Sequence, residues 1–595
     1  MLEDWRKLLS LFPAPEQRRI WLLLVIATFT GLVQAVGIAS VMPFIAVLAD
    51  PGLVDENPQL AWAYGALGFA DTRAFLLFLG LVAFAMLLVS NVLVGANAWL
   101  TLRVCHLGEH DLARRLLRRY LAQPYVRLRL RNSSDLVRML VSEVDRVAIV
   151  TLMAGIGVFS DAIATLAIVG MLLLVHPWIT LVTLLVLVAA YGLIYRLVTP
   201  AVVRLGIEFP ALNSEIFRAA SESLGAAREI KVLGLEERFV ERFSRPLLHS
   251  SRNAIRYGAL DLVPSQALEL VVFGGLVFVT VYLVGRAQDG SHILPMIALF
   301  GFAAYRLIPA LKGLLDGMET IRYNMAAIDP LWRDFAEPDP WVPPTSKESP
   351  LAPQREVRLE SVAFRYPGGD QDTLAGVDLV LPAGSATCLA GPTGAGKSTT
   401  VDVLIGLLSP TEGRLMVDDT PVTAANLREW QRCIGYVAQS VYLVDDTIER
   451  NIALGLEPQE IDASRLERAA RLAGIHDFVV RELPDGYRTV VGEDGARLSG
   501  GQCQRIGIAR ALYHDPAVLV LDEATNELDL ATEGRILQSL RALAGKTLIF
   551  VSHKPSVAAF CDQVCVLDRG RIVAVGSYQQ LTQPGSPYRD LLAEP

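Results

Sequence analysis

The stretch Gly391-Pro-Thr-Gly-Ala-Gly-Lys-Ser398 decides the fold of the C-terminal part of the chain. It lies between a predicted strand at 386–390 and a predicted helix at 399–408, and its glycines let backbone N–H groups converge on phosphate oxygens at a helix N-terminus. Lys397 supplies a positive charge, and Ser398 supplies a hydroxyl for Mg²⁺. A glycine-rich turn without ligand is the alternative, but both flanking elements favour a nucleotide phosphate loop. Its predicted members are Gly391, Pro392, Thr393, Gly394, Ala395, Gly396, Lys397, Ser398 and Thr399.

The sequence around this loop predicts an α/β domain with a largely parallel sheet. Short β-branched runs alternate with helical stretches, which is the pattern of such a sheet. These runs are 385–390, 518–521, 547–551 and 563–567. The run 518–521 is followed directly by Asp522-Glu523. We expect Asp522 to hold Mg²⁺ through water and Glu523 to act as general base on an attacking water.

The N-terminal part is predicted to span a membrane. The 595 residues are 52% hydrophobic and 19% charged, which excludes a disordered chain. Six apolar runs approach or exceed the roughly 20 residues that cross a bilayer. They are 20–49, 74–101, 147–175, 178–199, 266–285 and 291–311. We therefore expect a transmembrane domain at 1–335 with long cytosolic helical extensions, a proline-rich linker at 336–354 and a soluble domain at 355–595.

Charge predicts which loops face the cytosol. Arginines crowd 103–138 and 204–256, whereas 50–71 carries acidic residues only, so the first two segments face the cytosol and the third faces out. RNA-binding patches are the alternative for the basic segments. Acidic residues interleave them at helical spacing, and the net charge is −8, so we favour solvated helices and no nucleic-acid partner.

The six cysteines predict no disulfide scaffold. Cys561 and Cys565 could form a metal pair, but they lie in a Val/Leu-rich strand pattern, which favours buried thiols.

Leu498-Ser-Gly-Gly-Gln502 precedes an apolar helical run, and here the sequence resembles the signature motif of ABC transporters. The whole chain resembles a half-size ABC exporter: an α-helical polytopic membrane domain of six transmembrane helices, followed by an α/β P-loop ABC nucleotide-binding domain. The resemblance implies an ATPase coupled to transport, with ATP and Mg²⁺ as cofactors. It also implies a homodimer, because the phosphate loop of one subunit meets the signature of another; a heterodimer is the alternative.

The same resemblance implies roles for individual residues. Ser499, Gly500, Gly501, Gln502 and Asp529 would act in trans on ATP, Tyr366 would stack on adenine, and His553 would contact the γ-phosphate with Glu523 as base. The implied Mg²⁺ ligands are Ser398, Gln439 and Asp522. The implied docking segments are 123–132 and 213–224, with 492–495 contacting them. Asn526 and Glu527 stand where the family commonly has Ser-Ala, and Cys503 replaces Arg or Lys. These departures bear on coupling across the dimer.

Substrate features are sparser. Arg306 lies within the sixth predicted span, where it would either bind an anionic headgroup, form an interhelical ion pair or extend to the interface. The apolar loop 51–71, the run 37–44 and the run 305–309 are similar to PglK-type lipid-linked oligosaccharide flippases. We predict a flippase for a lipid-linked oligosaccharide or similar amphipathic anion in the bacterial inner membrane, with its nucleotide domain in the cytosol. The alternatives are a generic lipid, multidrug or peptide exporter and, from another class, an ATP-gated channel or a regulator.

Overall fold

A computed structural model describes residues 2–286, 293–336, 349–492, 495–543, 545–584, 586 and 589. The chain forms two compact units: Met1–Ala122 with Arg131–Pro340, and Gln123–Leu130 with Trp341–Pro595. Most of the predicted linker, 337–348, lies outside the described residues.

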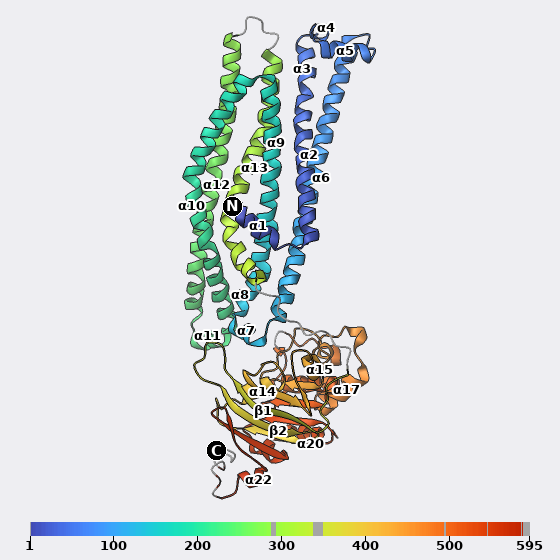
Figure 1. Cartoon of the computed structure of the whole chain (residues 1–595), viewed down its shortest axis with the longest axis vertical. Helices are drawn as coiled ribbons and strands as arrows, with labels where there is room; N and C mark the ends of the chain where they lie inside the picture. The colour runs from blue at the N-terminus through green and yellow to red at the C-terminus, as the bar shows by residue number, and fades with distance from the viewer. Residues whose placement is uncertain are drawn as a thin grey trace. The chain divides into compact units, whose positions relative to one another are not determined.

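The first unit consists of helices. Its helices are α1 (Leu2–Ser10), α2 (Ala14–Ala39), α3 (Val41–Ala49), α4 (Leu53–Glu56), α5 (Pro58–Ala66), α6 (Thr72–Ala122), α8 (Ser133–Arg138), η1 (Met139–Glu143), η2 (Arg146–Thr151), α9 (Leu152–Val175), α10 (Pro177–Gly225), α11 (Ala227–Leu233), α12 (Glu236–Arg286) and α13 (Ile293–Ala336). Helices α10 and α12 lie side by side, as do α2 and α6 (Figure 1).

Length and hydropathy mark several of these helices as membrane-spanning. Within the described residues, three stretches are long and apolar enough to cross a bilayer: Ala14–Ala49, Thr72–Ala122 and Ser133–Val175. The predicted fourth, fifth and sixth spans fall on α10, α12 and α13, and the count of six stays a prediction. The docking segment expected at 213–224 is part of α10; the separate short helix is α11, which follows it.

Helix α1 is held against the first unit by apolar burial. Leu8, Leu11 and Phe12 are buried in a cluster with residues of α6, α9 and α13. The Trp5 ring lies on Gly155 of α9, where a Cβ would overlap the indole. A larger residue at position 155 would therefore displace the Trp5 ring.

A buried charged cluster ties five helices of the first unit together. Arg146 of η2 donates to Asn324 Oδ1 of α13 at 2.9 Å and to Glu143 Oε2 at 3.2 Å. Its guanidinium carbon lies 4.5 Å from the ring centroid of Phe209 on α10, a cation–π contact. Arg138 donates to Glu143 Oε1 at 2.6 Å. Glu143 is thus paired with one arginine on each side of it in the sequence, and Glu143 and Arg146 lie in two π-helical turns, a rare geometry.

The second unit contains two sheets. The four-stranded sheet has the order β2-β1-β4-β5, and the six-stranded sheet has the order β10-β9-β3-β8-β7-β6. The strands are β1 (Glu356–Phe364), β2 (Leu374–Pro382), β3 (Ala386–Ala390), β4 (Glu412–Val417), β5 (Thr420–Pro421), β6 (Ile434–Val437), β7 (Val518–Asp522), β8 (Thr547–Val551), β9 (Gln563–Asp568) and β10 (Arg571–Gly576). All neighbours in the larger sheet are parallel except the β9–β10 pair.

Helices surround these sheets. They are α7 (Tyr125–Leu130), α14 (Lys397–Leu404), α15 (Leu427–Gln431), α16 (Ile448–Ile452), η4 (Pro458–Glu460), α17 (Ala463–Leu472), α18 (His476–Glu482), η5 (Gly486–Arg488), α19 (Gly500–Tyr513), α20 (Leu530–Arg541), α21 (Pro555–Phe560) and α22 (Tyr578–Leu581). Residues Gln123–Leu130 belong to this unit, Val126 of α7 packs on its core, and docking by 123–132 stays a prediction.

Burial on both faces explains the continuous apolar strands of the larger sheet. On β7, Val518 and Val520 join one core cluster while Leu519 and Leu521 join the other. Parallel strands covered on both sides carry no polar alternation. On β7 the first polar residue, Asp522, comes at the carboxyl end of the strand, where the candidate site lies.

Candidate ATP-binding and hydrolysis site

The phosphate loop connects β3 to α14. Gly396 has φ +100°, and a Cβ there would lie 2.9 Å from Leu374 Cδ2, so this position favours glycine. A Cβ on Gly391 would overlap the carbonyl oxygen of Leu567. The helix begins at Lys397, two residues earlier than predicted, and its N-terminus carries a partial positive charge suited to an anion.

The residues of the loop differ in exposure. Pro392, Thr393, Gly394 and Ser398 are exposed, whereas Ala395, Gly396 and Thr399 are buried. Lys397 Nζ donates to the carbonyl oxygens of Gly391 at 2.8 Å and Pro392 at 3.0 Å. Burial lowers the pKa of Lys397, and the nearby carboxylates of Glu523 and Asp522 partly oppose that shift. A cation and two carboxylates thus share one region.

Asp522 ends β7 and is 6% exposed. The pKa of Asp522 is raised to about 6, chiefly by burial and then by the charges of Glu523 and Asp402, against the opposing charge of Lys397. A buried carboxylate with this perturbation is a candidate functional group. Hydroxyl, amide and carboxylate oxygens, as in Ser398, Gln439 and Asp522, are the donors that Mg²⁺ prefers, so the residues fit this ion.

Glu523 stands directly after the strand with φ +49°, in the left-handed region that costs a non-glycine residue energy. Its carboxylate Oε2 accepts hydrogen bonds from Gln439 Nε2 at 2.8 Å and from Asn526 Nδ2 at 3.1 Å. Asn526 and Glu527 were noted in the sequence only as departures from a pattern. The structure brings Asn526 to the predicted base.

Tyr366 follows β1 and lies near α14. Its ring meets Phe364 edge-on with centroids 4.9 Å apart, and its hydroxyl is 3.3 Å from Thr399 Oγ1. The half-buried ring is held beside the phosphate loop. Stacking on adenine stays a prediction, as does the role of His553, an exposed residue two positions beyond β8.

The predicted signature segment begins α19. Ser499 Oγ accepts from Gln502 N at 3.3 Å, and Gln502 Oε1 accepts from Ser499 N at 2.7 Å, a reciprocal capping box. Glu527 lies so close to Gly500 that a Cβ there would overlap its carboxylate. An acidic side chain therefore covers the helix N-terminus that was expected to meet a phosphate.

Asp529 caps the next helix, α20, because its Oδ1 accepts from Thr532 N at 2.9 Å. Hydrogen bonds to Thr532 lower the pKa of Asp529 and keep it ionised. In the segment 492–495, Glu493 and Asp494 lie outside the described residues.

Arg306 contacts a neighbouring helix of the first unit. Arg306 on α13 is half-buried, and its Nη2 donates to Asn91 Oδ1 of α6 at 2.8 Å. This contact is an interhelical hydrogen bond to a neutral amide.

Cys561 and Cys565 are both buried, in the two different core clusters. Within the described residues, no group of three or more His, Cys, Asp or Glu could hold a metal.

Comparison with known proteins identifies the family. The family described as "ABC transporter" matches residues 374–526, and "ABC transporter transmembrane region" matches residues 20–305. The chain is 30% identical over 467 residues to the ATP-dependent lipid A-core flippase of Cupriavidus pinatubonensis (strain JMP 134 / LMG 1197), with 77% of this chain and 78% of that protein aligned.

The chain belongs to the ABC transporter family.

Two further comparisons extend over the whole ABC transporter chain. The ATP-dependent lipid A-core flippase of Xanthomonas campestris pv. campestris (strain 8004) is 28% identical over 596 residues, 99% of this chain and 96% of that protein. A bacterial Atm1-family ABC exporter with ATP bound has the same fold, with TM-score 0.77, 24% identity, and 97% and 98% of the two chains covered. The predicted half-size ABC exporter, an integral membrane ATPase coupled to transport, is thereby confirmed.

Proposed function

We propose that this ABC exporter hydrolyses ATP to move a lipid-linked oligosaccharide, or a similar amphipathic anion, from the inner to the outer leaflet. Arg306 is the observation that supports an anionic substrate. An arginine inside a membrane helix costs free energy, and the described partner of Arg306 is a neutral amide rather than a carboxylate. Its positive charge therefore stays available to a phosphate by paired hydrogen bonds. The relatives named lipid A-core flippases support a lipid substrate.

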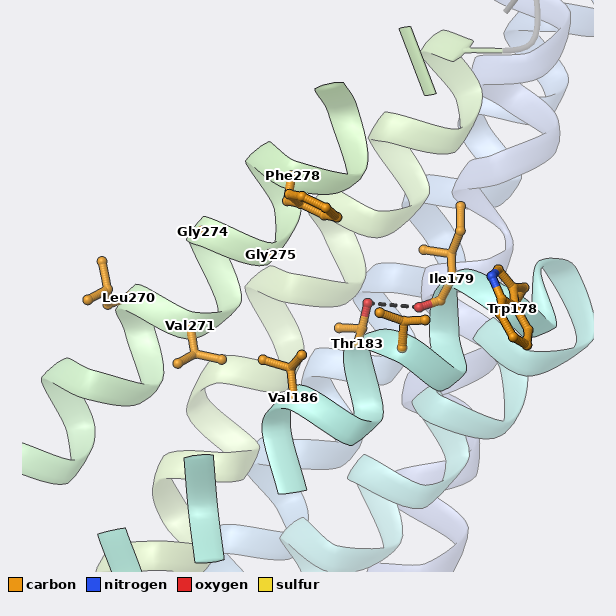
Figure 2. A pocket seen from close by; sticks show the side chains of 10 residues that line it. Trp178, Ile179, Thr183, Val186, Leu270, Val271, Gly274, Gly275 and Phe278 are labelled. Atoms are coloured by element: carbon orange, nitrogen blue, oxygen red, sulfur yellow. Dashed lines mark hydrogen bonds between the residues drawn. The ribbon is translucent and has the colours of Figure 1, made fainter. Parts of the chain in front are cut away.

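An apolar cavity supports the lipid part of this proposal. A space of about 680 Å³ lies between α10 and α12, within the range of ligand pockets (Figure 2). Its lining residues are Trp178, Ile179, Val182, Thr183, Val186, Leu270, Val271, Gly274, Gly275 and Phe278. The Thr183 hydroxyl already donates to the Ile179 carbonyl oxygen at 2.9 Å, so the lining suits hydrocarbon.

The segment between α3 and α6 is a second candidate for contact with a lipid tail. Helices α4 and α5 pack through Val54 and Tyr64 onto Phe75 of α6. The opposite side presents Trp62, which is 75% exposed, as an anchor typical of a membrane interface. This arrangement supports contact of the segment 51–71 with the membrane interface.

Hydrolysis would use the clustered residues described above. Lys397 would bind the β/γ-phosphates and Tyr366 would stack on adenine. Ser398, Gln439 and Asp522 would hold Mg²⁺, and Glu523 would take the proton of the attacking water. Bound Mg²⁺ would supply charge neutralisation on the phosphates. His553 would contact the γ-phosphate from the end of β8.

We infer a homodimer. Among the described residues, the signature segment, Ser499 to Gln502, contacts Glu527, and Arg505 Nε donates to Gly501 O; none of the described contacts joins it to the phosphate loop of its own chain. A second copy would supply the missing half of each ATP site, with Asp529 near the junction. We place the protein in the bacterial inner membrane with the nucleotide domain in the cytosol, from the arginine-rich segments.

The test compares substrates in proteoliposomes. ATPase activity and inside-to-outside movement are measured with a fluorescent polyprenyl-pyrophosphate oligosaccharide and with a plain phospholipid, in the parent, Glu523→Gln and Arg306→Ala. We expect movement of the polyprenyl substrate alone, its loss in Glu523→Gln, and weakened movement with nearly unchanged basal ATPase in Arg306→Ala. Phospholipid movement, or ATPase stimulated only by unrelated amphiphiles, would favour the generic exporter. Flux without turnover would favour a channel.

A further inference from the structure

The carboxylate of Glu523 is held by two amides that differ in origin. Gln439, which follows β6, donates to Oε2 at 2.8 Å across the site. Asn526, three residues further along the chain, donates to the same oxygen at 3.1 Å. Within residues 349–492 and 495–543, no donor is recorded for the other oxygen, Oε1. The two carboxylate oxygens therefore differ: Oε2 accepts two hydrogen bonds, and Oε1 accepts none from these residues.

The backbone explains how Asn526 reaches back. Glu523 N donates to Val551 O at 3.0 Å, which fixes Glu523 to the end of the β7–β8 ladder. Asn526 N then donates to Glu523 O at 3.1 Å, closing a turn that returns the Asn526 side chain toward the carboxylate. The left-handed backbone at Glu523 is the strained point of this turn.

We propose that Asn526 is a positioning residue for ATP hydrolysis: together with Gln439 it holds Oε2 of Glu523 and leaves Oε1 to accept the proton of the attacking water. The water oxygen forms a bond to the γ-phosphorus, the bond from that phosphorus to the β,γ-bridging oxygen breaks, and ADP leaves. The proton held on Oε1 passes on to the released phosphate. This inference rests on the proposed role of Glu523.

The amide is essential to this arrangement. A serine at 526, as the family commonly has, ends at Oγ, which is one bond closer to the backbone than Nδ2 of asparagine. Aspartate has nearly the same shape as asparagine but only accepts hydrogen bonds, and it would place a second negative charge against Oε2. Asn526→Asp therefore changes the donor with little change in volume.

The experiment measures kcat and KM for ATP in the full-length transporter. We expect Asn526→Asp to lower kcat by about tenfold or more, with KM changed by less than about threefold, because the carboxylate is misplaced while phosphate contacts are kept. Asn526→Ala should lower kcat less, since Gln439 still holds Oε2. Gln538→Glu, the same amide-to-carboxylate change on the exposed side of α20, is the matched control and should leave both constants unchanged.

Glu523→Gln separates the inference from the function on which it rests. If Glu523→Gln hydrolyses ATP at the parent rate, the assignment of the base is wrong. If Glu523→Gln is inactive but Asn526→Asp keeps the parent kcat, the base stands and the positioning role of Asn526 is refuted. If Asn526→Asp lowers kcat only together with a raised KM and a lower unfolding temperature, a structural role replaces the positioning role.

Discussion

The buried carboxylate of Asp522 should make the second unit less stable at neutral pH than at mildly acidic pH. Its pKa is raised from 3.8 to about 6, chiefly by burial. The folded unit therefore binds this proton more tightly than the unfolded chain, so the ionisation penalty grows as pH rises from 3.8 toward 6 and is nearly complete at pH 7. Asp522→Asn removes the charge while keeping the shape.

The magnitude follows from the size of the shift. A change from 3.8 to about 6 corresponds to about 3 kcal/mol of destabilisation at pH 7, an upper value because the site can relax. Lowering the pH to 5 should relieve a little under half of it, roughly 1.3 kcal/mol. In a domain of this size that is a rise of about 3 to 5 °C in unfolding temperature.

The assay is thermal unfolding of the nucleotide-free transporter in detergent with a chelator, at pH 5 and pH 7, together with hydrogen exchange in β7 and α14. The difference between the parent and Asp522→Asn isolates this group from others that titrate in the same range. We expect Asp522→Asn to unfold several degrees higher than the parent at pH 7 and to lose a little under half of that advantage at pH 5, while ATP hydrolysis disappears. Equal pH dependence in the two proteins, or a less stable variant at pH 7, would refute the reasoning.

Three other contacts predict measurable effects. Glu527→Ala should lower the ATP concentration for half-maximal ATPase by about threefold, because a negative charge no longer lies on Gly500 where phosphate is expected; an unchanged value would remove Glu527 from the site. Gly155→Ala should push the Trp5 ring away, cost about 1 to 3 kcal/mol of stability and so lower the unfolding temperature. In a chain that also carries Trp5→Ala, the change at Gly155 should have no effect. Equal losses in both backgrounds would contradict the contact. Arg146→Met should cost about 3 kcal/mol of stability in a thermal scan, since it leaves a buried carboxylate with one arginine, and a neutral result would mean that the remaining arginine suffices.

Local sequence determined the parts of this protein that depend on spacing along the chain. The loop at Gly391–Ser398 predicted its own strand and helix, and β3 has the predicted bounds, 386–390. Asp522 is the last residue of β7 and Glu523 follows it, so the two carboxylates stand where the apolar run ends. The resemblance to ABC exporters covered the whole chain and was confirmed by the comparisons.

Tertiary structure decided what depends on distant segments meeting. No pattern in the sequence shows that Gln439, 84 residues before Glu523, would donate to the same oxygen as Asn526, because that contact depends on strand order in the folded sheet. The sequence likewise did not predict the π-helical turns around Arg146 or the contact of Trp5 with Gly155, because both arise from packing between helices. Periodicity specifies which residues are apolar or polar, but only packing specifies which of them touch.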